Sequence, residues 1–114
     1  MTLQEVANLV NGEFVCGAER AQETVACAFS SDLMSDVLTL KTSDFLLITG
    51  LANTQAMRTA DMSDTQYILF VRNKNVTPEM IELAEDSGIV VMRSPYSMFK
   101  TAGILYGAGL QPVY

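Results

Sequence analysis

Four short runs of apolar and β-branched residues recur along this chain, and segments with helical spacing separate them. The runs contain few alternating polar residues, which is typical of strands that are covered on both faces of a sheet. Strands that alternate with helices predict a mostly parallel sheet with right-handed crossovers and helices on both faces. The apolar runs are 25–29, 45–49, 67–71 and 89–92, and the helical segments are 33–40, about 53–61, 78–87 and 97–106.

The residues before this repeat predict one more helix and one more strand. Thr2 followed by Glu5 is a capping-box pattern, and the apolar residues at positions 3, 6, 7, 9 and 10 share one helical face. Residues 13–16 indicate a short strand that ends at Gly17, and residues 18–23 are polar enough for a loop. We therefore expect a single α/β domain over residues 1–114, with a mostly parallel sheet of about five strands.

The clearest helix signals flank residues 78–87. Thr77 is a good N-cap, Pro78 suits the first helical position, and Gly88 can supply a left-handed stop. Farther along, Gly103, Gly107 and Gly109 lie within or after the last helix, where they suggest close packing and a C-cap.

The charge of the chain limits its partners. The chain has seven Lys and Arg and thirteen Asp and Glu, which gives a net charge of −6. This negative charge repels phosphate backbones and anionic lipid surfaces. We expect no nucleic-acid partner and no membrane partner. No basic region precedes an apolar stretch at the N-terminus, and no apolar run approaches the roughly 20 residues of a spanning helix, so we expect a cytoplasmic protein.

The residue types that common catalytic sites need are largely missing. The chain has no histidine, which excludes a Ser-His-Asp or Cys-His relay, and no phosphate-loop motif. Cys16 and Cys27 lack metal-ligand spacing and are interpreted as buried free thiols. We expect no enzyme activity, catalytic residue, metal or cofactor. One acidic cluster is interpreted as the solvated face of its helix: Glu79, Glu82, Glu85 and Asp86.

Polar residues follow each of the four repeated strands. In an open parallel sheet, ligands bind beyond the carboxyl ends of the strands, near helix N-termini. Three of the seven basic residues fall there, which predicts an anionic small molecule with phosphate or carboxylate groups, such as a nucleotide; solvated connecting loops are the alternative. The candidate ligand-binding residues, strand by strand, are Ser30, Ser31 and Asp32; Thr49, Gly50 and Asn53; Arg72, Asn73 and Lys74; Arg93, Ser94 and Ser97.

Residues 30–36, SSDLMSD, contain two Ser-Asp pairs. If Ser31 or Asp32 is the N-cap of the next helix, Asp36 lies in its first turn and favours the helix dipole. Asp32 and Asp36 alone make a poor metal cage, so we favour the cap over a metal site. The apolar residues that this helix would turn toward the core are Leu33, Val37 and Leu40.

The last helical segment carries little charge beyond Lys100, which is consistent with a homodimer. The chain also contains seven methionines. Some of them either fill gaps in the core or contribute to an adaptable interface: Met57, Met62, Met92 and Met98.

Four stretches together resemble a DRTGG domain: residues 31–38 (SDLMSDVL), 45–49 (FLLIT), 77–91 and 97–110. The resemblance covers nearly the whole chain and is greatest to short stand-alone members. It implies an α/β fold like that of the N-terminal domain of HPr kinase. It also implies a regulatory, dimer-forming role, because larger relatives carry the domain as an accessory part of phosphotransacetylases, CBS-domain pyrophosphatases and cobyrinic-acid-synthase-like proteins. No catalytic residues are implied.

One departure from the family concerns the Thr-Gly-Gly element, expected after the third repeated strand. That position reads Val71-Arg72-Asn73-Lys74. Without the two glycines the backbone loses permissiveness, while the two cations can supply charge to a ligand.

Two hypotheses for function follow. The first is a non-enzymatic regulatory or ligand-sensing domain, a homodimer that binds an anionic small molecule at the carboxyl edge of the sheet. The alternative is a protein-interaction or assembly module for a redox or iron–sulfur enzyme, since stand-alone members of the resembled family are often encoded near iron-only hydrogenase and other iron–sulfur genes.

Overall fold

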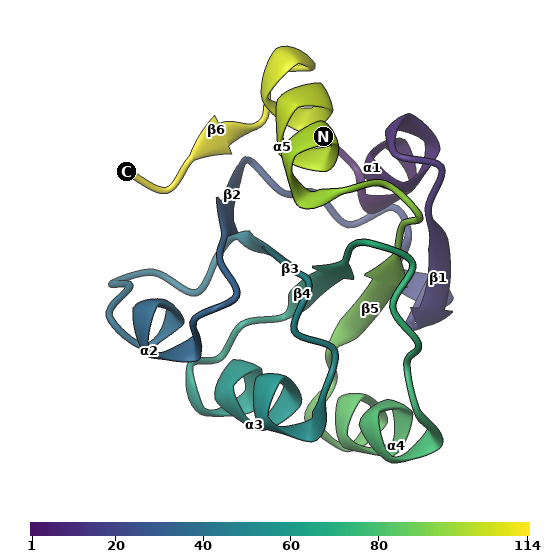
Figure 1. Ribbon diagram of the computed structural model, residues 1–114, viewed down its shortest axis with the longest axis vertical. Helices are drawn as coiled ribbons and strands as arrows, with labels where there is room; N and C mark the ends of the chain where they lie inside the picture. Colours follow the sequence, from purple (N-terminus) through teal and green to yellow (C-terminus); the bar gives the residue numbers. More distant parts are fainter.

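Six strands form one sheet between two layers of helices in the computed structural model, which describes residues 1–114 (Figure 1). Their spatial order is β1-β5-β4-β3-β2-β6, and only β1 runs antiparallel to its neighbour. The mostly parallel α/β fold is therefore confirmed. The strands are β1 (Glu13–Cys16), β2 (Cys27–Ser30), β3 (Leu46–Thr49), β4 (Tyr67–Phe70), β5 (Val90–Arg93) and β6 (Gln111–Pro112).

The helices cover both faces of the sheet, as predicted. Figure 1 shows α1 and α5 on one side of it and α2, α3 and α4 on the other. Each face carries a cluster of 14 buried residues, so the two cores are of equal size. None of the helices combines the length and the apolar character needed to cross a bilayer. The helices are α1 (Leu3–Leu9), α2 (Met34–Val37), α3 (Thr54–Met62), α4 (Pro78–Ser87) and α5 (Met98–Gly107), with a short 3-10 helix η1 (Ala18–Arg20).

The central strands β3 and β4 are buried along their whole length, which explains their continuous apolar runs. Alternate residues face opposite layers: Leu46 and Ile48 pack with α1 and α5, while Leu47 packs with α2, α3 and α4. The carboxyl ends of β2, β3, β4 and β5 consequently meet at one edge of the sheet.

The predicted helix starts are confirmed where the capping signals are local. The Thr2 side chain accepts from the Glu5 amide in a complete capping box, and Thr77 accepts from the Met80 amide. Caps of this kind contribute about 1 kcal/mol each. Gly88 closes α4 in the left-handed conformation, with φ 70°.

Helix α2 differs from its prediction. It spans only residues 34–37, and its N-cap is Leu33, which has an extended backbone and no side-chain cap. Leu33 is exposed rather than buried, whereas Val37 is buried and Asp36 lies in the first turn as expected. The predicted cap fails because the Asp32 carboxylate bonds to other elements.

Two smaller expectations are corrected, and a third question is answered. Cys16 and Cys27 are free but only partly buried. Gly103 has no close packing, since a Cβ there would meet nothing within 4 Å. The methionines divide between both interpretations. Met57 and Met92 lie in the core and Met62 is exposed.

The sixth strand, β6, is not predicted by the sequence. Its two residues include a proline and carry no strand pattern, so pairing with the edge of β2 creates it.

Candidate functional site

Asp32 links the ends of three neighbouring strands at the carboxyl edge of the sheet. Its Oδ1 accepts from the hydroxyl of Thr49, the last residue of β3, at 3.2 Å and from the amide of Gly50, which follows the strand, at 2.6 Å. Its Oδ2 lies 3.3 Å from Nη2 of Arg72, which follows β4. The carboxylate thus joins three loops that are distant in sequence.

The guanidinium of Arg72 lies close to Gly50, on the side where a side chain would be. A methyl group at Gly50 would overlap the Arg72 guanidinium, so the absence of a side chain makes room for the cation. The side chain of Arg72 is 50% exposed, and its one ion pair is the single contact to Asp32. An arginine can donate five hydrogen bonds, so most of its capacity faces solvent.

The backbone at Arg72 and Asn73 is left-handed, with φ values of 63° and 53°. Glycine adopts this conformation most readily, and here two residues with side chains hold it. Such strain costs about 1 kcal/mol or more at each residue and is often found at functional sites. The Arg72 amide donates to the Tyr96 carbonyl at 2.7 Å and the Asn73 amide to the Ser94 carbonyl at 3.0 Å, which holds the turn in place.

Arg93 lies at the same edge but has different partners. Its guanidinium forms an ion pair with Glu13 on the antiparallel strand β1, and its Nη1 lies 3.5 Å from the Lys74 carbonyl. The side chain of Lys74 forms no ion pair. Arg93 is therefore paired away from Arg72 and meets Lys74 only at its backbone carbonyl, and no contact joins the guanidinium of Arg93 to that of Arg72.

Several of the predicted site residues have structural partners. Ser94 is fully buried, donates to the Val10 carbonyl at 2.6 Å and accepts from the Tyr96 amide. Two others cap helices: Asn53 caps α3 and Ser97 caps α5. Each of these side chains satisfies backbone groups of the fold.

The two Ser-Asp pairs stay close to each other without forming a metal site. The Ser31 hydroxyl accepts from the Leu33 amide at 3.0 Å and lies 3.5 Å from Oδ2 of Asp36. No three thiol or carboxylate side chains converge anywhere in the structure. The carboxylate of Asp32 instead bonds to Thr49, Gly50 and Arg72.

An apolar groove lies beside this edge, between α5 and the β2–β6 pair. Its volume is about 370 Å³, and of the predicted site residues only Ser30 lines it. The sequence does not predict this groove, because β6, which has no strand pattern, forms one wall. The other walls come from Ala28, Phe29 and Ile48 of the sheet, from Ala102, Leu105 and Tyr106 of α5, and from residues 110–114.

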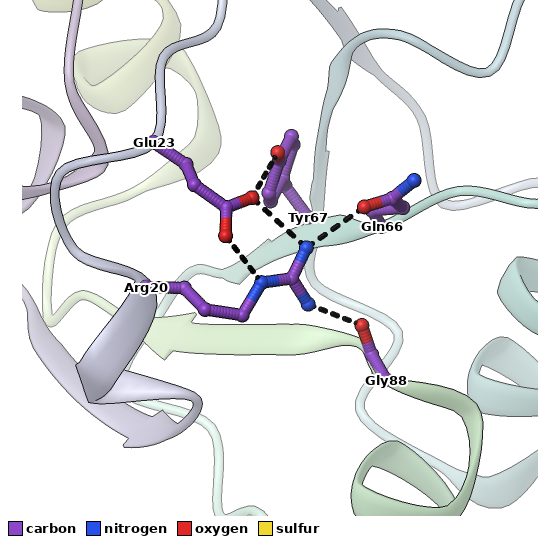
Figure 2. Close-up of polar contacts among 5 residues, drawn as sticks. All are labelled: Arg20, Glu23, Gln66, Tyr67 and Gly88. Carbon is purple, nitrogen blue, oxygen red and sulfur yellow. Dashed lines mark hydrogen bonds and ion pairs between the residues drawn. The ribbon is translucent and has the colours of Figure 1, made fainter.

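The densest polar network was also missed, and it lies at the opposite edge of the sheet. Figure 2 shows the Arg20 guanidinium among Glu23, Gln66 and the Gly88 carbonyl, with the Tyr67 hydroxyl on the same glutamate. Nε of Arg20 lies 2.7 Å from Oε2 of Glu23, and the Tyr67 hydroxyl donates to Oε1 of Glu23 at 2.7 Å. The polar residues 18–23 predict only a loop, and the pairing of strands brings the remaining partners of Arg20 near.

This network shifts the ionisation of its members. The hydrogen bonds from Arg20 and Tyr67 lower the pKa of Glu23. Burial, followed by the hydrogen bond to Glu23, raises the pKa of Tyr67. Because nearly all N–H groups of Arg20 are used within the fold, we assign the network to stability rather than to ligand binding.

The fold and its polar carboxyl edge define a small, mostly parallel α/β domain of the kind that binds ligands beyond its strand ends. The chain belongs to the DRTGG domain family, whose model matches residues 5–108. Comparison with curated protein sequences finds no match.

A solved structure has the same fold. It is a crystal structure of the CBS and DRTGG domains of the regulatory region of Clostridium perfringens pyrophosphatase, complexed with the activator diadenosine tetraphosphate. The TM-score is 0.78 and the sequence identity is 16% over 98% of this chain. This chain spans 48% of the length of that chain.

Proposed function

We propose that the chain is a non-enzymatic, cytoplasmic regulatory domain that acts as a homodimer and senses an anionic small molecule at the carboxyl edge of its sheet. The observation that carries this proposal is Arg72, a half-exposed guanidinium that lies close to Gly50 beside a strained turn. A cation held in place but only weakly paired is suited to bind phosphate or carboxylate groups.

The charges around Arg72 define how binding would occur. Asp32 already accepts the Gly50 amide, so an incoming anion would meet the outward N–H groups of Arg72 rather than the backbone. Lys74, on the same loop, can add a second positive charge, since it forms no ion pair. Arg93 is expected to contribute less, because Glu13 neutralises it.

The nature of the ligand is suggested by the comparisons. The regulatory region that shares this fold was crystallised with diadenosine tetraphosphate, a polyanionic nucleotide that is its activator. We propose a ligand of the same chemical class for this chain, with phosphates that pair with Arg72 and Lys74.

A thermal-shift panel tests this proposal. It would contain diadenosine tetraphosphate, adenosine nucleotides, acyl phosphates and carboxylic metabolites. A ligand at 100 times its dissociation constant adds about 2.7 kcal/mol, which corresponds to a rise of roughly 10 °C in Tm for a chain of this size. A flat response to the whole panel would contradict ligand sensing.

The variant Arg72→Ala links the shift to the site. We expect it to abolish most of the ligand-induced rise in Tm, whereas the matched control Arg58→Ala removes an exposed arginine from α3 and should keep it. An equal loss in both variants would indicate non-specific charge attraction, and no loss in either would move the site away from Arg72.

A second candidate function is favoured by the outer face of α5, where Phe99 and Tyr106 are exposed. In this case the chain is an interaction or assembly module for a redox or iron–sulfur enzyme. Light scattering of mixtures with candidate enzymes would detect a defined complex without any metabolite. A complex that persists in Arg72→Ala would favour this function over ligand sensing.

A further inference from the structure

The outer face of α5 has no partner in the structure. Thr101 and Leu105 turn inward and are buried, whereas Phe99 and Tyr106 on the opposite side are 89% and 67% exposed. Helical spacing places Gly103 between these two aromatic residues and Gly107 beside Tyr106. Two large apolar side chains and two glycines therefore share one surface.

Nothing inside the chain accounts for the two glycines. Neither Gly103 nor Gly107 has a positive φ, and a Cβ at either position would meet no atom within 4 Å. A glycine inside a helix costs about 1 kcal/mol relative to alanine. The missing side chains leave notches beside Phe99 and Tyr106 that a group outside the chain can enter.

The charge distribution favours a second copy of the chain as the occupant. The net charge of −6 makes copies repel each other, yet no Asp or Glu follows Asp86. Helix α5 itself thus carries no carboxylate side chain, and its one cation, Lys100, lies 3.9 Å above the ring of Tyr96. Two α5 helices can approach without bringing their own side chains into acidic repulsion.

The exposed apolar area is large enough for a dimer. Tyr106 also lines the apolar groove, together with Tyr114, which is 89% exposed. With about 200 Å² for each aromatic side chain, Phe99, Tyr106 and Tyr114 offer roughly 500 Å² per protomer. A two-fold pair would bury about 1,000 Å², which is the lower limit for a specific interface.

We propose that two copies associate through antiparallel α5 helices that cross at Gly103, a register that gives the proposed homodimer its interface. Residues at equal distances from the crossing then meet, so Phe99 of one copy enters the notch at Gly107 of the other. Lys100 lies against Tyr106 of the second copy. The large side chain of Phe99 and the space at Gly107 complement each other under two-fold symmetry, as an isologous interface requires.

Sedimentation equilibrium of the full chain tests this interface with two variants. Phe99→Ala removes the side chain that enters the notch at Gly107 of the other copy. Gly103→Leu places a bulky side chain at the helix crossing, and the monomer should still fold because a Cβ at Gly103 meets no atom within 4 Å. We expect each to raise the dimer dissociation constant by about 30-fold or more, as for a central interface residue. Met62→Ala, which truncates an exposed apolar side chain on α3, should leave it unchanged.

The register has its own test. In a Cys16→Ser, Cys27→Ser background, Gly103→Cys should give a disulfide-linked dimer on mild oxidation, because the two positions face each other at the axis. A wild-type chain that is monomeric, or a dimer that resists Gly103→Leu, would overturn the proposal. A monomer that still responds to nucleotides would remove the homodimer together with this interface and leave ligand sensing. A dimer without any ligand response would remove ligand sensing and leave the interface.

Discussion

At the scale of single residues, Gly50 decides where Arg72 lies. The backbone of Gly50 has no positive φ, so alanine can adopt its conformation, and the three atoms nearest to an added methyl group all belong to the flexible end of Arg72. We predict that Gly50→Ala weakens the binding of a phosphate ligand while it changes the free energy of unfolding by only about 0.5 kcal/mol. Titration calorimetry and urea unfolding measure the two quantities. Wild-type affinity in Gly50→Ala would show that the position of Arg72 is not important for binding.

At the scale of elements, Arg20 ties η1 to the start of β4 and the end of α4 (Figure 2). We predict that Arg20→Ala lowers the free energy of unfolding by about 1–3 kcal/mol, since it removes charge-assisted hydrogen bonds and leaves the Gly88 carbonyl without this donor. Tyr67→Phe should cost about 1 kcal/mol. Urea unfolding measures both, with Arg58→Ala as the control. If Arg20→Ala matches Arg58→Ala, the network adds nothing to stability.

At the scale of the whole molecule, the same network makes stability depend on pH. Hydrogen bonds from Arg20 and Tyr67 lower the pKa of Glu23 below its ordinary 4.5. A lowered pKa in the folded state stabilises the fold above the unfolded-state value, and this contribution is lost as pH falls through the folded-state pKa. We predict that wild type exceeds Glu23→Gln in stability at neutral pH and that the difference shrinks below about pH 4.5.

Thermal unfolding of wild type and Glu23→Gln between about pH 3 and about pH 7 measures this difference in stability. Glu82→Gln, on the outer face of α4, is the control for the general effect of one carboxylate in an acidic chain, because Glu82 has no ion pair or side-chain hydrogen bond. A stability difference for Glu23→Gln that stays constant with pH would mean that the ionised glutamate is not preferentially stabilised by the fold.

Elements with local signals were predictable, and elements whose partners are distant were not. Helix α4 begins and ends where Thr77 and Gly88 indicate, because a cap and a left-handed stop act within one turn. The N-cap predicted for α2 at Ser31 or Asp32 fails because the Asp32 carboxylate bonds to Gly50 and Arg72, and β6 exists only through its pairing with β2.

The candidate site divides in the same way. Parallel topology alone brings the residues after β2, β3, β4 and β5 to one edge, so their neighbourhood follows from the alternating pattern. The separation of Arg93 from Arg72 does not follow, since it depends on Glu13 in β1, which pairs antiparallel beside β5. Strand order is set by packing across the whole sheet.

Taken by itself, the sequence determined the alternating strands and helices, the caps of α1 and α4, the polar edge and the excess of negative charge. These properties depend on residues a few positions apart or on composition. The tertiary structure alone decided which carboxylates Arg72 and Arg93 meet. Asp32 pairs with Arg72 across 40 residues and Glu13 with Arg93 across 80, and a charge finds its partner only when folded elements bring them into contact.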